Sequence, residues 1–417
     1  MNRYVYNTIK SEFVDNGNSV LLYGPAGIGK SHLLRQLAAG LKNYVLIDLQ
    51  IDREFTDGLL VVINQNGSVC DYIASFFGFE SNRVKNDSYF FLDGIEVLKS
   101  SAKQLLLMDL PRHIAFSTSR IDFTGCFLDG RINKHILFKL RPFSFYEFLE
   151  LLTENGFPEY VSVLKAHYER RIPLPELIEE EISELFHDYL LVGGYPEAIL
   201  QYIQDRASVS DIRRVQEKLF ATILLRLSDN LPKDVSPVRL NQIISYCRTH
   251  AADNRGSFHP GHIRKGAVAE EFRPEITYLQ QNGILLTVND ANNSLSRFEI
   301  ADCGLLRYLA NDYDAFYLLD SDGKLPEYFY QNYMYTFLEA ENKKIRFWKN
   351  GRTQYIPYYD SNVALRHSYS EKIPEYESFW SSEDRKSVTI YNVMDMYQKV
   401  KTADHNIKYY FLEQTQF

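Results

Sequence analysis

Short apolar runs alternate with helical patterns through the first third of the chain. Five of these runs are rich in aliphatic and aromatic residues, and they cover residues 19–23, 44–48, 89–93, 113–118 and 136–140. Continuous apolar runs are typical of strands buried on both faces, and strands that alternate with helices form parallel sheets. The pattern therefore predicts an α/β layer around a parallel sheet, in which ligands bind at the carboxyl ends of the strands.

A glycine-rich segment follows the first run and reads Gly24-Pro25-Ala26-Gly27-Ile28-Gly29-Lys30-Ser31. It fits the pattern G-x-x-x-x-G-K-[ST] at every defined position. The glycines permit backbone conformations that other residues avoid, so that successive N–H groups can surround an anion. The leucine spacing of residues 32–38 predicts a helix directly after the loop, and a helix N-terminus also attracts anions. We predict a phosphate-binding loop here, in preference to a turn that binds nothing.

Individual residues of this loop have different roles in nucleotide binding. Lys30 supplies a positive charge for the β- and γ-phosphates, and Ser31 offers a hydroxyl to Mg²⁺. We expect the backbone of the whole segment to contact the nucleotide, and we predict ATP and Mg²⁺ as the cofactors. The expected contact residues are Gly24, Pro25, Ala26, Gly27, Ile28, Gly29, Lys30, Ser31 and His32.

The run at residues 89–93 ends in a carboxylate that suits the same site. In nucleotide hydrolases an aspartate at this place orients Mg²⁺, and we assign Asp93 that role. Many ATPases carry a glutamate directly after it, but here Gly94 follows and the next carboxylate is Glu96. Glu96 is a candidate base for the attacking water if the chain turns sharply at Gly94. The slightly favoured alternative is a solvated glutamate in the first turn of a helix.

Hydroxyl residues end the run at residues 113–118. The chain there reads Ser117-Thr118-Ser119-Arg120, and we select Thr118 as a candidate hydrogen-bond donor to the γ-phosphate or the attacking water. Ordinary turn chemistry is the alternative, since Ser and Thr favour such positions. The candidates from these strands and from the loop all lie at carboxyl ends of predicted strands. This agreement is the main support for a single site.

Composition narrows the classes of protein that fit. A chain of 417 residues is long for one core, so two or three domains are expected. The net charge of −8 argues against a generally basic nucleic-acid binder. The cysteines are widely scattered and form no C-x-x-C pair, so neither a zinc ribbon nor a disulfide framework is suggested; they are Cys70, Cys126, Cys247 and Cys303. Because no apolar run approaches the ~20 residues of a membrane span and residues 1–6 lack a signal-peptide core, we expect a cytoplasmic protein with no membrane contact.

Three more segments occur in an order that resembles a known family. They are Gly130-Arg131, Leu140-Arg141-Pro142-Phe143-Ser144-Phe145-Tyr146-Glu147-Phe148 and Gly193-Gly194-Tyr195-Pro196-Glu197. Together with the phosphate loop they resemble the AAA-type ATPases of the archaeal-ATPase branch of the P-loop NTPases. The match covers most of the chain in order.

The resemblance implies roles for residues outside the phosphate loop. It implies that Gly193, Gly194 and Pro196 line the adenine side of the nucleotide. It also implies that Arg131 senses or stabilises phosphate charge, as arginine fingers do. A surface arginine after a turn is an equally weighted alternative for Arg131. From the residues alone, the glycines end one helix and Pro196 starts the next.

The remaining chain is expected to form three further modules after a nucleotide-binding core at residues 1–155. A charged helical lid covers 156–235, and a winged-helix-like module covers 236–312, because two helical patterns there precede a hairpin at 283–300. The resemblance predicts the same winged helix and its exit at Asp302-Cys303-Gly304-Leu305. Arg273 stands among Glu270, Glu271 and Glu275, a poor phosphate-binding face, so a structural arm is favoured over a DNA-binding module.

The last module, residues 313–417, is expected to be a small α+β domain. The resemblance implies a degenerate restriction-endonuclease-like fold, in which Glu327 matches a helix glutamate. The acidic strand residues of such nucleases are missing, since the chain reads Gln354-Tyr355-Ile356 where they should stand. We therefore expect no nuclease chemistry, which needs clustered carboxylates to hold Mg²⁺. The many tyrosines there are interpreted as packing residues rather than as a binding surface.

The combined prediction is an ATP-binding protein whose Mg²⁺-dependent, slow hydrolysis drives a conformational switch. The alternative is a regulatory or interaction switch with little or no turnover, which associates with a protein partner or with DNA. Gly94 in place of the usual glutamate favours this alternative. A small-molecule kinase is a third reading, which the phosphate loop alone permits. An arginine that acts in trans would require an oligomer.

Overall fold

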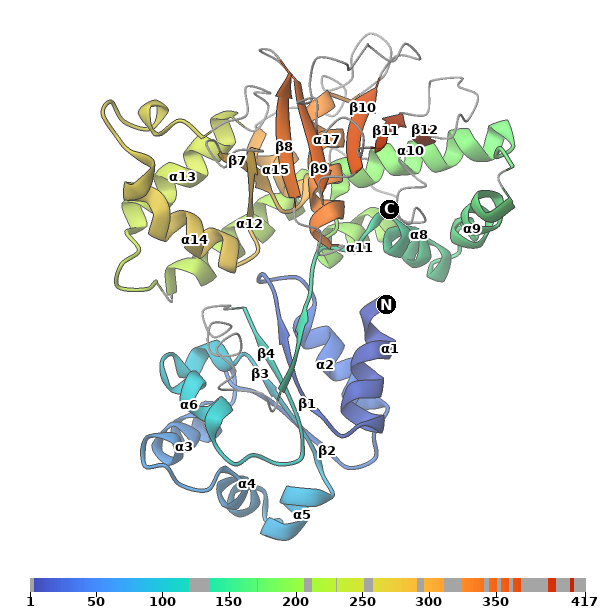
Figure 1. The fold of residues 1–417 in the computed structure, drawn as a ribbon. Helices are drawn as coiled ribbons and strands as arrows, with labels where there is room; N and C mark the ends of the chain where they lie inside the picture. Colours follow the sequence, from blue (N-terminus) through green and yellow to red (C-terminus); the bar gives the residue numbers. More distant parts are fainter. Residues whose placement is uncertain are drawn as a thin grey trace.

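The computed structural model describes residues 4–119, 135–170, 172–205, 212–229, 231–250, 258–290, 296–310, 325–340, 345–350, 354–359, 363–368, 389–394 and 406–408. Figure 1 shows two halves, each built around one sheet, that are joined by the segment that follows β5. The first half contains the five predicted strands. The second half contains the helical region and the last strands of the chain.

The first sheet is all parallel and has the order β2-β3-β4-β1-β5. Its strands are β1 (Ser19–Tyr23), β2 (Tyr44–Asp48), β3 (Tyr89–Asp93), β4 (His113–Thr118) and β5 (His135–Lys139). The predicted α/β fold class and its five strands are confirmed, and only β5 lies one residue earlier than expected. Because β4 lies between β1 and β3, its carboxyl end separates the end of β1 from Asp93.

Alternate residues of the strands enter two different cores. Val20 and Leu22 of β1 belong to a core that includes Ile9 and Leu34, from the helices α1 (Tyr4–Lys10) and α2 (Lys30–Ala39). Leu21 faces the other core, which is closed by α3 (Arg53–Asn64), α4 (Val69–Phe77) and α6 (Ser101–Leu107). This two-sided burial explains why the strands read as continuous apolar runs. Both helical layers are visible in Figure 1.

A capped helix begins directly after the sheet. Ser144 is the N-cap of α8 (Phe145–Glu154): its Oγ accepts a hydrogen bond from Glu147 N, and Glu147 Oε2 accepts one from Ser144 N. This capping box explains the Ser-Phe-Tyr-Glu spacing. Glu147 also accepts from Tyr4 N at 3.0 Å, which ties the beginning of α1 to α8. Four helices follow: α9 (Tyr160–Arg170), α10 (Glu176–Val192), α11 (Pro196–Asp205) and α12 (Ile212–Asp229).

The second sheet crosses a boundary that the sequence analysis placed at residue 312. It has seven strands in the order β12-β11-β10-β9-β8-β6-β7. The expected hairpin is present as β6 (Leu285–Asp290) and β7 (Ser296–Ile300), which are antiparallel. However, β6 also pairs in parallel with β8 (Ile345–Asn350), where Asn289 lies opposite Arg346. The hairpin is therefore part of the same sheet as the last strands of the chain.

The other strands and helices of this half complete the layer. The strands are β9 (Gln354–Tyr359), β10 (Val363–Ser368), β11 (Thr389–Met394) and β12 (Asn406–Lys408). The helices are α13 (Pro237–His250), α14 (Arg273–Gln281), α15 (Cys303–Ala310) and α17 (Glu327–Ala340). The winged-helix and nuclease-like assignments of these elements stay predictions.

The described residues also give information on membrane-spanning helices, metal-binding clusters and disulfides. No helix among them is both long enough and apolar enough to cross a bilayer. Within the same part of the chain, no cluster of three or more His, Cys, Asp or Glu side chains is arranged to hold a metal ion. Cys70, Cys247 and Cys303 are buried and form no disulfide within the described part of the chain, and Cys126 lies outside the described residues.

Candidate nucleotide-binding site

The phosphate loop connects the end of β1 to the first turn of α2. Gly24, Gly27 and Gly29 have φ values of 154°, 79° and 96°, in the region that side-chain-bearing residues rarely adopt. Gly29 is the residue before α2, whose first helical residue is Lys30. A strand, a glycine loop and a helix N-terminus thus follow one another as the sequence predicts. This arrangement directs backbone N–H groups toward an anion.

Packing adds a second reason for two of these glycines. A Cβ on Gly24 would lie 2.4 Å from the carbonyl oxygen of Leu140, just beyond β5. A Cβ on Gly27 would lie 2.6 Å from Leu219 Cδ1 of α12. The loop is therefore pressed between the first sheet and the helical region. Sequence reasoning identified the conformational requirement but not this close packing.

Lys30 lies within the loop that it serves. Its buried side chain extends back, and Nζ donates hydrogen bonds to the carbonyl oxygens of Gly24 and Pro25, each at 2.8 Å. A phosphate in the loop would compete with these carbonyls for the ammonium donors. Ser31 follows in the first turn of α2 and is half-buried, while His32 is exposed. Ile28 is fully buried and anchors the loop in the core.

Asp93 is held at the carboxyl end of β3 by the neighbouring strand. Its side chain is 5% exposed and accepts a hydrogen bond from Ser117 Oγ of β4. The same hydroxyl oxygen accepts from Gly94 N at 3.0 Å. Thr118, which is fully buried, pairs in register with Tyr23, the last residue before the loop. The structure therefore brings Thr118 to the end of β1 and places Ser117 against Asp93.

Glu96 is not on a solvated face, so the interpretation favoured from sequence is wrong. The chain turns at Gly94, which has a φ of 80°, and Glu96 lies in the following 3₁₀ helix, Ile95–Leu98. Its side chain is 6% exposed and accepts hydrogen bonds from Ser119 N (3.2 Å) and Ser119 Oγ (2.9 Å). The sequence argument considered only the local helix and missed the end of β4, where Ser119 lies. The catalytic role of Glu96 stays a prediction.

The Gly-Gly-Tyr-Pro turn lies against the phosphate loop. The ring of Tyr195 is 3.8 Å from the place where a Cβ on Gly27 would stand, and Tyr195 itself is buried. Gly193 has a φ of 83° and ends α10, and Pro196 begins α11, as the sequence predicts. Gly194 accepts a hydrogen bond from Phe143 N at 2.7 Å. The turn thereby connects the exit from the first sheet to the loop.

Asp302, directly before α15, holds this turn from a distant part of the chain. Its side chain is 4% exposed; one oxygen accepts from Gly194 N at 2.7 Å, and the other accepts from Leu305 N at 2.8 Å. Burial raises the pKa of Asp302 to about 6, against the opposing effect of these backbone donors. The sequence analysis singled out residues 302–305 as a module exit but gave the carboxylate no role. An Asp before a helix is an N-cap signal, and its bond to Gly194 has no local signal.

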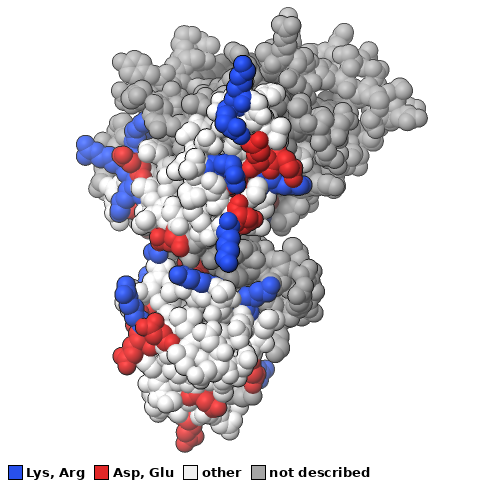
Figure 2. Space-filling view, turned by 90° about the vertical axis from the view of Figure 1, so that its left-hand side faces the viewer, with Lys and Arg blue, Asp and Glu red and all other residues white. Residues whose placement is uncertain are grey.

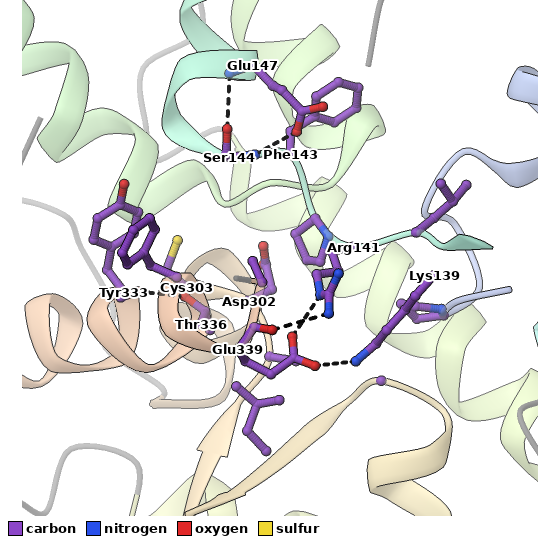
Figure 3. Close-up of a pocket in the computed structure, with 18 of the residues that line it drawn as sticks. Lys139, Arg141, Phe143, Ser144, Glu147, Asp302, Cys303, Tyr333, Thr336 and Glu339 are labelled. Carbon is purple, nitrogen blue, oxygen red and sulfur yellow. Dashed lines mark hydrogen bonds and ion pairs between the residues drawn. The ribbon is translucent and has the colours of Figure 1, made fainter. Parts of the chain in front are cut away.

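A cavity of about 370 Å³ lies beside the loop, between the first sheet and α17 (Figure 3). Pro25 lines it together with Lys139 and Arg141, and both cations pair with Glu339. Arg141 Nε lies 2.9 Å from Glu339 Oε2, and Arg141 Nη2 also donates to the Glu339 carbonyl oxygen at 3.2 Å. Burial by itself would raise the pKa of Glu339, but Lys139 and Arg141 together lower it below its ordinary value.

Arg131, the arginine selected from the sequence, lies outside the described residues. A different arginine reaches this side of the first sheet from α12. Arg226 Nη2 donates to Gln50 Oε1 at 2.6 Å, and Gln50 Nε2 would lie 3.3 Å from a Cβ on Gly94. Sequence reasoning missed Arg226 because the contact joins residues far apart in the chain and no local pattern marks it.

Comparison with known proteins gives structural similarity only. No protein-family model matches the chain, and no curated protein matches it significantly. A Walker-type ATPase of Pyrococcus abyssi is similar with a TM-score of 0.46 and 18% identity, over 74% of this chain and 95% of that one. A mutant of RuvB from Thermotoga maritima follows with a TM-score of 0.31 and 13% identity, over 70% and 89%.

A STAND protein, a signal-transduction ATPase of Pyrococcus horikoshii, is similar over 82% of this chain and 45% of that one, with a TM-score of 0.29 and 12% identity. These similarities are low, so the assignment depends on the chain's own geometry. That geometry comprises the strand, glycine loop and helix of residues 19–39, the all-parallel sheet and the carboxylate at the end of β3. The first half of the chain is therefore a P-loop nucleotide-binding fold.

Proposed function

We propose that the protein binds ATP with Mg²⁺ in the phosphate loop and hydrolyses it slowly, and that hydrolysis switches the arrangement of the two halves. The observation that carries the proposal is the intact loop before α2, with Lys30 inside it and Asp93 two strands away across β4. Both the loop and the carboxylate lie at the carboxyl ends of strands in one parallel sheet.

Each loop and strand residue has a defined task in this proposal. Lys30 binds the β- and γ-phosphates with its ammonium group, and the backbone of residues 24–32, with the N–H groups of its non-proline residues, surrounds them. Ser31 and Asp93 hold Mg²⁺, and their hydroxyl and carboxylate oxygens are the ligand type that this ion prefers. When bound, the ion neutralises phosphate charge. Thr118 orients the γ-phosphate or the attacking water by a hydrogen bond.

Glu96 is the proposed base that polarises the attacking water. Its burial and its bonds to Ser119 support the role, because they fix the carboxylate at the end of β4, where Ser117 bonds the proposed metal ligand Asp93. The second candidate function is a switch with little or no turnover. Gly94 favours it, because this glycine occupies the position where many ATPases place the glutamate.

Residues outside the phosphate loop are proposed to contact the adenine ring and to supply positive charge near the phosphates. We propose that Gly193, Gly194 and Pro196 line the adenine side, in agreement with the contact between Tyr195 and the loop. Arg131 is proposed to stabilise phosphate charge, and Arg226 is a second candidate because it contacts Gln50 near Gly94. Guanidinium groups serve this purpose because they stay charged and bond to oxygen pairs.

Surface charge does not favour nucleic acid as the partner. Lys and Arg side chains alternate with Asp and Glu on the described surface that Figure 2 shows, without a broad basic area. The net charge of the whole chain is −8. We therefore propose a protein partner or self-association in preference to DNA. We keep the four-module division at residues 155, 235 and 312 as part of this proposal, with a second sheet that spans the last boundary.

The first test replaces the loop lysine. We expect Lys30→Ala to weaken ATP·Mg²⁺ binding by well over tenfold in isothermal calorimetry, a loss of more than about 1.4 kcal/mol, because the ammonium contact to the phosphates is removed. Lys103→Ala is the matched control, since Lys103 is exposed on α6. Equal affinities of Lys30→Ala and Lys103→Ala would reject the site.

The second test separates an ATPase from a switch without turnover. We expect Glu96→Gln to lower the single-turnover hydrolysis rate about 10²–10⁴-fold while ATP affinity stays close to that of the wild type. Asp93→Asn is the control for loss of metal binding, and it should reduce the Mg²⁺ dependence as well. A wild-type rate no faster than that of Glu96→Gln would favour the second function. Acceleration by an added metabolite would instead indicate a kinase.

A further inference from the structure

Three elements outside the first sheet touch the phosphate loop. Leu219 of α12 packs closely against the loop at Gly27, since a Cβ there would lie 2.6 Å from it, and the ring of Tyr195 from the Gly-Gly-Tyr-Pro turn lies next to the same residue, 3.8 Å from that Cβ position. The turn between α14 and β6 contacts it as well, because a Cβ on Gly283 would lie 3.1 Å from Pro25 Cδ. A ligand in the loop therefore lies next to elements of the second half of the molecule.

Asp302 bonds the first of these elements to the start of α15. One carboxylate oxygen accepts from Gly194 N, directly before Tyr195, and the other accepts from Leu305 N in the first turn of α15. The side chain thus serves as the N-cap of α15 and as a cross-link to a turn 108 residues earlier in the sequence. Both partners are backbone N–H groups, so the Asp302 side chain holds the backbone of the turn in a fixed position relative to the backbone of α15.

The elements around this link are closely packed. A Cβ on Gly193 would lie 2.5 Å from Asp302 Oδ1, and a Cβ on Gly304 would lie 2.2 Å from the carbonyl oxygen of Val192. Gln216 Nε2 of α12 donates to the carbonyl oxygens of Leu191 and Val192, at 2.8 and 3.1 Å. The end of α10, the turn, α12 and the start of α15 therefore behave as one packed unit.

We propose that Asp302 is the positioning residue that couples nucleotide occupancy of the phosphate loop to α15 and, through it, to the second sheet. This inference rests on the proposed ATP binding. Tyr195 lies next to the loop at Gly27, so a nucleotide that shifts Tyr195 also shifts the adjacent N–H of Gly194. Asp302 transmits that shift to α15, which packs against α17 and follows β7. The phosphate loop and α15 are thereby coupled, because the contacts of the Gly-Gly-Tyr-Pro turn differ between the nucleotide-bound and nucleotide-free states.

Substitution at this residue can cut the link without removing the helix cap. In Asp302→Ser the shorter hydroxyl still caps α15 by accepting from Leu305 N, but it lacks the second oxygen that binds Gly194 N. Asp188→Asn is the matched control. Asp188 accepts from Tyr202 OH at 2.5 Å within the helical region, and an asparagine oxygen preserves that bond.

The experiment is hydrogen exchange of the full chain with and without saturating ATP·Mg²⁺ at one fixed pH. In the wild type and in Asp188→Asn, we expect nucleotide to increase protection of both the loop (residues 24–31) and α15 (residues 305–309). In Asp302→Ser, we expect the loop to remain protected while the response of α15 is lost. Circular dichroism checks the fold, and Asp302→Asn replaces Asp302→Ser if the latter does not fold.

The outcomes distinguish the coupling from the proposed function. An α15 response of wild-type size in Asp302→Ser would overturn the coupling alone, and so would protection of the wild-type loop without any response of α15. If nucleotide protects neither segment of the wild type, the proposed ATP binding fails and the coupling fails with it.

Discussion

Two carboxylates of the second half, Asp302 and Glu339, hold elements that lie next to the P-loop fold, and they do so by different physical means. Asp302 is 4% exposed and bonds to backbone N–H groups, and burial raises its pKa to about 6. Glu339 is 26% exposed and pairs with two cations, and its pKa is lowered overall. We name these contacts the Asp302 joint and the Glu339 joint.

The difference teaches which joint determines geometry. Backbone groups cannot move without moving their elements, so the Asp302 joint positions α15 against the Gly-Gly-Tyr-Pro turn. The long side chains of Lys139 and Arg141 can follow Glu339 through changes of rotamer, and water screens partly exposed charges. The Glu339 joint therefore adds attraction between the halves but tolerates displacement. The predictions below test this contrast from the largest expected effect to the smallest.

The largest effect is expected for Gly193→Ala, next to the Asp302 joint. The new Cβ would overlap Asp302 Oδ1 at 2.5 Å, and Gly193 has a φ of 83° and a ψ of 179°, a region used almost only by glycine. We expect a loss of about 2–4 kcal/mol in the free energy of unfolding, measured in urea. Gly78→Ala is the control, because its Cβ would meet nothing within 4 Å. Gly78 has a φ of 68°, so backbone strain of roughly 1 kcal/mol is expected there. Equal losses for the two variants would contradict tight packing at the Asp302 joint.

The second effect is a pH dependence that belongs to Asp302. Its folded pKa of about 6 exceeds the value of 3.8 for an unperturbed Asp, so between these values the folded state binds more protons than the unfolded state. Stability therefore falls as pH rises through this range. We expect a decrease of about 1–2 kcal/mol between pH 5 and pH 7 from this residue. Asp302→Asn should remove that share of the pH slope in urea unfolding. An unchanged slope would show that Asp302 is ionised as easily as in the unfolded chain.

The smallest effect is expected at the Glu339 joint. Glu339→Gln should cost about 0.5–1 kcal/mol in urea unfolding, because the pair is partly exposed, and about 1 M salt should reduce the difference further. The pH sign is opposite to that of Asp302: the lowered pKa contributes stability above pH 4.5, and that stability is lost as pH falls through the folded pKa. Glu197→Gln, which breaks the exposed pair with Lys218, is the control and should have little effect. A larger loss for Glu339→Gln than for Gly193→Ala would reverse the ranking of the joints.

Local sequence signals predicted the first sheet and the phosphate loop well. The central strands β1, β3 and β4 are buried on both faces, and every strand of that sheet is an apolar run, so that the residues of each run predict a strand and its approximate limits. The glycines at 24, 27 and 29 likewise have a conformation that the loop itself requires. Pro196 at the start of α11 is a further local signal that is confirmed.

The features that depend on contacts between distant segments were not predicted, because no local sequence pattern marks them. The first-turn position of Glu96 favoured a solvated side chain, but its partner Ser119 comes from another strand. Arg226 beside Gln50 and Asp302 beside Gly194 join segments that lie far apart in the chain. The hairpin of β6 and β7 was predicted, whereas the pairing of β6 with β8 was not, because β8 comes after both α15 and α17 in the sequence.

The amino-acid sequence by itself therefore determined the strands of the parallel sheet, the anion-binding loop and the carboxylate that ends β3, because each depends on neighbouring residues and on backbone preferences. The tertiary structure alone decided that Glu96 is buried, that Asp302 caps α15 while holding the Gly-Gly-Tyr-Pro turn, and that one sheet spans the second half. These features arise from the desolvation and pairing of polar groups that meet only after the chain has folded.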